Sequence, residues 1–120
     1  MRLPAPATWL ASALGSSGVL HLLRPRTFEP LVPPELGDAR AWVLGTGVAE
    51  IVTAALLAAP STRRAGGWSA AGLLAGFVPA HLHQFRLAAG RPVPLAIAAV
   101  RLPLQAPLIA AALRVARGRR

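Results

Sequence analysis

Five polar side chains that lipid would exclude lie within otherwise apolar segments: His21, Glu50, His81, Arg101 and Gln105. A charged group near the centre of a membrane-spanning helix costs roughly 2.5–3.5 kcal/mol on insertion scales. Such residues normally face the interior of a helix bundle, where they form a binding site or a structural lock. Carboxylate, imidazole and guanidinium together could bind an oxygenated headgroup and exchange protons with it. These five residues are therefore the candidate ligand-binding site.

No catalytic motif accompanies them. The chain has no Ser–His–Asp order, glycine-rich phosphate loop or paired-carboxylate motif, so its catalytic residues stay unknown and we expect it not to be an enzyme on its own. Two histidines and one carboxylate on three helices lack the spacing of a metal site, and Arg101 would repel a cation, so no metal site is predicted. The absence of cysteine excludes disulfides, thiol redox chemistry and thiolate-bound metals.

The composition is that of a small membrane protein. The 120 residues are 54% hydrophobic and only 14% charged, with a mean hydropathy of +0.51. A soluble domain needs about a quarter of charged residues for its surface. All 13 basic residues are arginine, and most flank apolar runs, which is how membrane proteins place cations that meet lipid headgroups. Because these arginines form no soluble basic face, no nucleic-acid partner is predicted.

Four apolar runs are long enough to cross the bilayer as helices. They cover residues 7–23, 42–59, 65–85 and 95–113. Residues 24–40, between the first two runs, hold four prolines and three of the four acidic residues, which predicts a loop with one interfacial turn near residues 28–31. The predicted fold class is all-α: a four-helix transmembrane bundle of antiparallel up-down topology, forming a single membrane domain over residues 1–120.

An even number of spans places both termini on the same side of the membrane. Seven arginines then lie on that side and five on the other. The side with more arginines is expected to be cytoplasmic, which predicts a protein integral to the inner (plasma) membrane with both termini in the cytoplasm. Arg2 and Ala11-Ser12-Ala13 resemble parts of a cleavable secretory signal, but the apolar run continues to Leu23, so we expect this segment to be retained as a span.

Each predicted helix carries one polar stripe. Its members are spaced i, i+3 or i, i+4, as Ser17 and His21 are, and therefore share a helix face. Counting from the span ends places all four stripes in the outer half of the bilayer, where they could face one another across the bundle axis. Glu50 and Arg101 could then neutralise one another as a buried pair. Two interpretations stay open: a pocket for a small amphiphile or for protons, and a structural layer that only locks the bundle.

The third predicted span has two further features. Gly72-x-x-x-Gly76 permits close helix contact, and we expect that contact within the chain rather than in a homo-oligomer, which is the alternative. His83 lies on a different helix face from His81 and is expected to point towards the membrane interface or the outer loop. His83 is therefore not among the candidate site residues.

Short motifs recur in the order found in a known family. They are Gly18-Val-Leu-His21, the loop Phe28-Glu-Pro-Leu-Val-Pro-Pro34, Gly47-Val-Ala-Glu50, Pro79-Ala-His-Leu-His83 and Arg101-Leu-Pro-Leu-Gln105. Together they resemble the DoxX-like family of small four-helix integral membrane proteins, over roughly residues 12–115. Members of that family commonly have Pro-Ala-Asn in helix three. His81 therefore departs from the pattern, although it keeps a polar hydrogen-bonding group.

The resemblance implies a membrane location and a link to quinone chemistry, because the family name derives from a membrane subunit linked to thiosulfate oxidation by quinone. We therefore expect a membrane subunit of a quinone-linked redox or stress-response system. A bound quinone or lipid would occupy the polar site and a redox partner subunit would supply electrons, since nothing in the chain is itself redox-active. The alternative is a non-catalytic membrane scaffold whose buried polar layer only locks the helices. The lipid bilayer is a partner in both cases.

Overall fold

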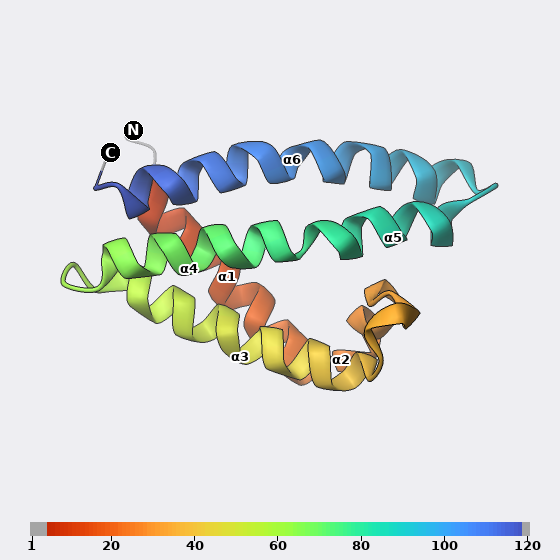
Figure 1. The fold of residues 1–120 in the computed structure, drawn as a ribbon, viewed down its shortest axis with the longest axis horizontal. Coiled ribbons are helices and arrows are strands. Elements are labelled where there is room, and N and C mark those ends of the chain that lie inside the picture. Colours follow the sequence, from red (N-terminus) through yellow and green to blue (C-terminus); the bar gives the residue numbers. More distant parts are fainter. Residues whose placement is uncertain (1–4, 119–120) are drawn as a thin grey trace.

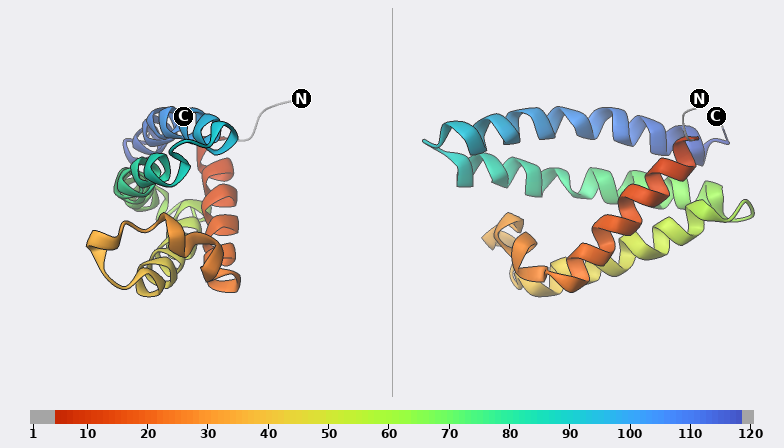
Figure 2. Two further views of the ribbon diagram at one scale, coloured as in Figure 1. Left: turned by 90° about the vertical axis from the view of Figure 1, so that its right-hand side faces the viewer. Right: turned by 180° about the vertical axis from the view of Figure 1, so that it is seen from behind.

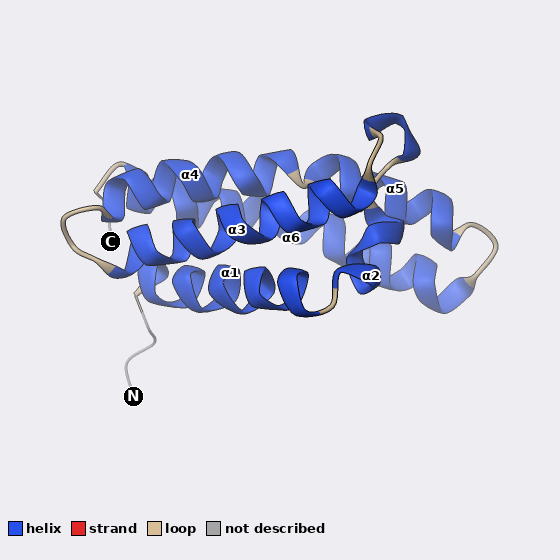
Figure 3. Ribbon diagram, turned by 90° about the horizontal axis from the view of Figure 1, so that it is seen from below, coloured by secondary structure: helices blue, strands red, loops and turns tan. Residues whose placement is uncertain are grey.

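The computed structural model describes residues 5–118, which form helices and turns and contain no strand (Figure 3). The α-helices are α1 (Pro6–Leu23), α2 (Pro25–Phe28), α3 (Ala39–Ala58), α4 (Arg63–Gly76), α5 (Val78–Ala88) and α6 (Pro92–Ala116), and two 3-10 turns are η1 (Glu29–Leu31) and η2 (Pro34–Leu36). The predicted all-α class is confirmed. The turn expected near residues 28–31 is also present, within a short helical segment that joins α1 to α3.

The long helices run back and forth along an axis of 44 Å (Figure 1). α1 packs chiefly on α3, whereas α4 and α5 follow one another and both pack on α6. Seen from behind, α1 crosses the molecule diagonally from the end of α6 to the start of α2 (Figure 2). The first turn of α1 and the last turn of α6 therefore lie at one end of the molecule, which is called the termini end below.

The third predicted span, residues 65–85, is not one continuous helix. It is divided at Phe77 into α4 and α5. Pro79 explains the break, because proline has no N–H to donate to the carbonyl of Ala75 and its ring crowds that carbonyl. By contrast, α6 continues through Pro103 and Pro107, and it begins at Pro92 rather than at residue 95, since the first turn of a helix tolerates proline.

Two helices, α3 and α6, are long and apolar enough to cross a membrane. At about 1.5 Å per residue, the 20 residues of α3 extend about 30 Å, the thickness of the hydrocarbon core. α1 is shorter, and Ser16, Ser17 and His21 dilute its leucines. α4 and α5 are each too short on their own because of the break at Phe77. Of the four predicted spans, only the second and the fourth therefore correspond to helices that are long and apolar enough to cross a membrane.

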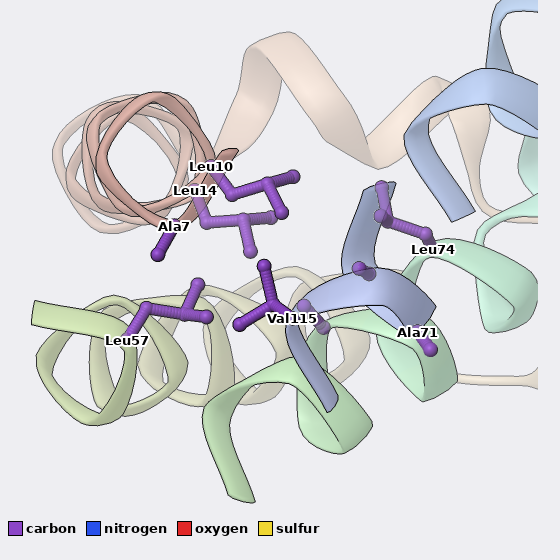
Figure 4. Close-up of a cluster of buried hydrophobic side chains, with 9 residues drawn as sticks. Ala7, Leu10, Leu14, Leu57, Ala71, Leu74 and Val115 are labelled. Carbon is purple, nitrogen blue, oxygen red and sulfur yellow. The ribbon is translucent and has the colours of Figure 1, made fainter. Parts of the chain in front are cut away.

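The apolar core lies at the termini end of the molecule. Residues of α1 face residues of α3, α4 and α6 there, as Figure 4 shows for seven of them. The cluster consists of Ala7, Leu10, Leu14, Leu57, Ala70, Ala71, Leu74, Ala112 and Val115. Many of these side chains are small, so the helices approach one another closely. The core thereby fixes one end of the bundle and leaves the other end more open.

Gly67 permits the closest of these approaches, and its replacement gives a direct test of the packing. A Cβ added to Gly67 would overlap the backbone nitrogen of Ala116 and lie 2.9 Å from the carbonyl oxygen of Ala112. We expect Gly67→Ala to lower the free energy of unfolding by about 1–3 kcal/mol, because α4 must move away from α6. Thermal unfolding in a mild detergent would measure the change.

Gly72→Ala is the matched control on the same helix. A Cβ at Gly72 would meet no atom within 4 Å, and alanine favours a helix over glycine by about 1 kcal/mol. Gly72→Ala should therefore leave the midpoint of unfolding unchanged or raise it. Equal destabilisation by Gly67→Ala and Gly72→Ala would show that α4 does not pack on α6 in this way.

Candidate functional site

A cavity of about 620 Å³ opens between the α1–α3 pair and α4–α5, away from the termini end. Pockets that bind small molecules commonly measure about 300–1,000 Å³. Its apolar walls are formed by Phe28, Leu31, Val32, Pro33, Leu36, Trp42, Val43, Leu73, Phe77, Pro79 and Ala80. The segment between α1 and α3 covers the cavity, since η1 contacts both α3 and α5. An apolar ring or chain would fit such a lining.

Three polar side chains also line the cavity: His21, Thr46 and Ser69. The Thr46 hydroxyl donates to the backbone carbonyl of Trp42 at 2.7 Å, which leaves its oxygen able to accept a further hydrogen bond. The hydroxyl oxygens of Ser69 on α4 and Thr53 on α3 are 2.6 Å apart. This hydroxyl pair ties the two walls together. The polar groups are thus few and convergent, as in sites that orient a mostly apolar ligand.

Gly72 and Gly76 leave space in the cavity rather than making a helix contact. Both line its wall, and a Cβ at either would meet no atom within 4 Å. The prediction that Gly72-x-x-x-Gly76 packs against another helix of the chain is therefore wrong. Side chains at these two positions would project into the volume that an occupant needs.

Different glycines bring His21 against Glu50. A Cβ at Gly47 would lie 2.7 Å from Cβ of His21, and a Cβ at Gly18 would lie 2.7 Å from the carbonyl oxygen of Gly47. α1 and α3 can approach this closely only because both positions are glycine. As a result, Nε2 of His21 is 3.7 Å from Oε1 of Glu50. The pair is buried, with exposed fractions of 8% for His21 and 1% for Glu50.

The hydrogen bonds of His21 define what this pair can do with protons. Nδ1 lies 2.7 Å from the backbone carbonyl oxygen of Ser17, which only accepts, so the network assigns a proton to Nδ1. Nε2 then faces Oε1 of Glu50 at 3.7 Å, which makes an ion pair when the ring carries a second proton. Such a pair is neutral overall, which suits a site removed from water. Among the described residues, Oε2 of Glu50 has no hydrogen-bond partner.

His21 connects the buried carboxylate to the cavity. Its ring stacks on Phe28 of α2, with centroids 4.0 Å apart and planes inclined by 15°. Both rings belong to the cavity wall, whereas Glu50 does not. The imidazole of His21 therefore lies between Glu50 and any molecule that occupies the cavity.

The other three predicted site residues form a separate polar group on α5 and α6. Arg101 donates from Nη1 to Oε1 of Gln105 at 2.6 Å, and Gln105 donates from Nε2 to the backbone carbonyl of Leu74 at 2.7 Å. His81 Nδ1 lies 3.4 Å from Oε1 of Gln84. Leu74 is in the last turn of α4, whose carbonyls lack partners within the helix. Gln105 therefore fastens α6 to the point where the third span breaks.

The predicted pairing of Glu50 with Arg101 is wrong. Glu50 pairs with His21, and no ion pair or hydrogen bond among residues 5–118 joins Glu50 to Arg101. The cause is the way the helices associate. α3 packs on α1, whereas the part of α6 that carries Arg101 packs beside α5. Neither Arg101, Gln105 nor His81 lines the cavity, so the predicted single layer of five residues is divided into two groups.

The segment that covers the cavity is anchored at three points. Arg40 Nε lies 3.2 Å from Oε1 of Glu29, and Arg86 Nη1 lies 2.8 Å from Oε1 of Glu35. The Trp42 indole donates to the backbone carbonyl of Leu36 at 2.8 Å. These contacts attach the segment to both α3 and α5. They hold Leu36 and its neighbours over the opening of the cavity.

One of these anchors depends on pH. The hydrogen bond from Arg86 holds the pKa of the Glu35 carboxyl below its ordinary value of 4.5. Because the pKa of Glu35 is lowered in the folded state, the contact stabilises the folded chain when the pH is above the ordinary pKa. This stabilisation is lost as the pH falls through the lowered pKa. Both side chains are exposed, so solvent screens the interaction and its contribution is small.

His83, like Thr53, is a buried polar residue outside the predicted site. It is 7% exposed, and its Nδ1 has no hydrogen-bond partner among the described residues. It does not line the cavity, so it stays outside the candidate site. No set of three or more metal-ligating side chains gathers within residues 5–118.

A family model matches residues 10–116 of the chain, and its description is Domain of unknown function (DUF8561). The chain belongs to this family. The match begins inside α1 and ends with α6, so it includes the cavity, the His21–Glu50 pair and the group around Arg101. No curated protein and no solved structure matches the chain.

Proposed function

We propose that this DUF8561 family member is an integral membrane protein whose cavity binds a lipid-soluble molecule with a quinone-like headgroup. It would serve as the membrane subunit of a redox or stress-response system, with a partner subunit supplying electrons. The observation that carries the proposal is the 620 Å³ apolar cavity with the His21–Glu50 pair at its wall. The resemblance of the sequence motifs to the DoxX-like family supports the same class of ligand.

The exposed faces of the helices support a membrane location. Only 17% of the most apolar window of α6 is buried inside the molecule, and 28% of that of α3. A core helix of a soluble protein would bury such a window, whereas a lipid-facing helix leaves it outside. The large apolar side chains at least 50% exposed are Leu23, Val48, Val52, Trp68, Leu82, Val93, Ile97 and Val100. They come from α1, α3, α4, α5 and α6, which favours four membrane-crossing passes.

The arginines support an orientation with both termini in the cytoplasm. By sequence, seven arginines flank the predicted spans on the side of the termini, against five on the other side. The three acids Glu29, Glu35 and Asp38 all belong to the segment between α1 and α3, at the other end. Arginine-rich ends of membrane proteins face the cytoplasm. The cavity and its covering segment would then lie in the outer half of the bilayer.

The chain's own residues account for how such a ligand would be held. Phe28, Trp42 and Phe77 are aromatic side chains that can pack against a ring. The Ser69 hydroxyl can donate a hydrogen bond to a quinone oxygen, whereas the Thr46 oxygen can accept one from a hydroxyl of the reduced form. His21 would hold or pass a proton between the ligand and Glu50. A bound quinone would supply the redox chemistry that the side chains lack. The covering segment and the lipid around the helices would keep water from the ligand.

Fluorescence of Trp42 tests this proposal, because Trp42 lines the cavity whereas Trp9 and Trp68 do not. In a variant carrying Trp9→Phe and Trp68→Phe, a short-chain quinone should quench the remaining fluorescence saturably at micromolar concentration. The matched control carries Trp9→Phe and Trp42→Phe, so that Trp68 on the outer face of α4 is the reporter. Equal, non-saturating quenching of both reporters would mean that the quinone only partitions into the detergent, and would contradict the proposal.

A non-catalytic membrane scaffold is the second candidate, favoured by one observation. Gln105 is 3% exposed, accepts from Arg101 within α6 and donates to the backbone carbonyl of Leu74, so this buried amide fastens α6 to α4. Such a contact has the form of a structural lock. Under this alternative the cavity would be occupied by lipid chains without headgroup selectivity, and the quinone titration of Trp42 would fail.

A further inference from the structure

We propose that the termini end carries a binding site for a phosphate-bearing anion. A second cavity, of about 340 Å³, lies there between the start of α1, the turn that joins α3 to α4 and the end of α6. Arg63 and Arg64 line this cavity, and no acidic residue does. The site is separate from the one that holds His21, and only the choice of a lipid as the source of the phosphate rests on the membrane location proposed above.

Both guanidinium groups are fixed by the ends of neighbouring helices. Arg63 donates from Nε to the carbonyl of Leu57 at 2.9 Å and from Nη2 to that of Ala58 at 3.2 Å, in the last turn of α3. Arg64 donates from Nε to the carbonyl of Ala116, the last residue of α6, at 3.2 Å. Arginine side chains are flexible in solution, and ordering them costs conformational entropy. Because these contacts already order the two side chains, binding an anion would lose less entropy.

The same contacts leave donors for a ligand. Among the described residues, Nη1 and Nη2 of Arg64 and Nη1 of Arg63 have no hydrogen-bond partner. Guanidinium groups bind phosphate oxygens with a planar fork of N–H donors. No acidic side chain among the described residues forms an ion pair with Arg63 or Arg64.

The shape of the second cavity indicates the part of the anion that it accepts. Pro6, Ala7, Pro60 and Val115 add apolar lining to the two arginines. A phosphate joined to an apolar group, as in the headgroup region of an anionic phospholipid, would use both parts of this lining. Free phosphate would use the arginines alone. If this end of the bundle faces lipid headgroups, it would meet the phosphate of an anionic phospholipid.

The test is stabilisation of the purified protein in mild detergent at constant ionic strength. Dihexanoyl-phosphatidylglycerol, dihexanoyl-phosphatidylcholine and inorganic phosphate would be titrated separately against the midpoint of thermal unfolding. We expect phosphatidylglycerol to raise the midpoint saturably and phosphatidylcholine to leave it unchanged. Stabilisation by inorganic phosphate at equal concentration would identify free phosphate as the source, whereas stabilisation by phosphatidylglycerol alone would identify the lipid.

Arg64→Gln should raise the apparent Kd for phosphatidylglycerol about fivefold, the effect of removing one arginine beside a phosphate. Arg91→Gln is the charge-matched control, since Arg91 lies exposed between α5 and α6 at the opposite end. Ala5→Leu changes no charge but would fill the cavity, so it should weaken binding even if Arg64→Gln does not fold. Equal stabilisation by phosphatidylcholine, or equal losses in Arg64→Gln and Arg91→Gln, would overturn the proposal.

Discussion

His21→Leu is expected to lower the free energy of unfolding by about 3–5 kcal/mol, the usual result of removing one partner from a buried ion pair. Glu50 is 1% exposed, and its Oε2 already lacks a partner among the described residues. Without His21, the carboxyl would have to remain ionised away from water or take up a proton at a free-energy cost. Thermal or denaturant unfolding in mild detergent would measure the change.

Glu50→Gln should be milder than His21→Leu. Glutamine is neutral and can donate a hydrogen bond to Nε2 of His21, while Nδ1 keeps its bond to the carbonyl of Ser17. The double variant, His21→Leu with Glu50→Gln, should recover much of the stability that His21→Leu alone loses, because no carboxyl is left buried without a partner.

His81→Leu is the matched control for this series. His81 is half-buried and its hydrogen bond is to Gln84, so its loss leaves no buried carboxyl behind. We expect a decrease of about 1 kcal/mol or less in the free energy of unfolding. Strict additivity of His21→Leu and Glu50→Gln would contradict the pairing of these two residues.

The second large effect is expected from a change that fills the cavity. Gly72→Phe would place a ring where the structure has open space, on a helix that gains propensity when glycine is replaced. A ligand and this ring could share the cavity only by displacing its walls, at a cost of about 1–3 kcal/mol. Affinity for a short-chain quinone should therefore fall about ten- to a hundredfold, while the protein stays folded.

The intrahelical contacts of the site could be predicted from the sequence. Ser17 and His21 are four residues apart and meet, as do Arg101 and Gln105. Helical periodicity alone fixes these contacts, whatever the rest of the chain does. The apolar surroundings of Glu50 likewise predicted that it would be buried.

Contacts between helices could not be predicted in the same way. Glu50 meets His21 rather than Arg101 because glycines at positions 18 and 47 let α1 approach α3 closely. Glycines at positions 72 and 76 have the same spacing as a packing motif, yet they line a cavity. Whether a neighbouring helix packs on a given glycine depends on the arrangement of all the helices, which a local sequence pattern does not predict.

The break at Phe77 could not be predicted with certainty from the position of Pro79 either. Pro79 interrupts the third apolar run, whereas Pro103 and Pro107 do not interrupt the fourth. A proline within an apolar run therefore does not by itself decide between a continuous helix and two helices. Gln105 provides a further partner at the end of α4, by donating to the carbonyl of Leu74. Because Gln105 belongs to another helix, the spacing of residues within the third run does not predict this contact.

Native mass spectrometry of the mildly extracted protein tests most directly whether the cavity binds a lipid-soluble ligand. We predict that the wild-type chain retains a molecule with the mass of a quinone or similar amphiphile and that Gly72→Phe loses it. Gly45→Phe is the control, since Gly45 also has no atom within 4 Å of an added Cβ but does not line this cavity, and it should retain the molecule. Retention of the same molecule by wild type and Gly72→Phe alike, or by neither, would contradict the assignment of this cavity as the ligand site.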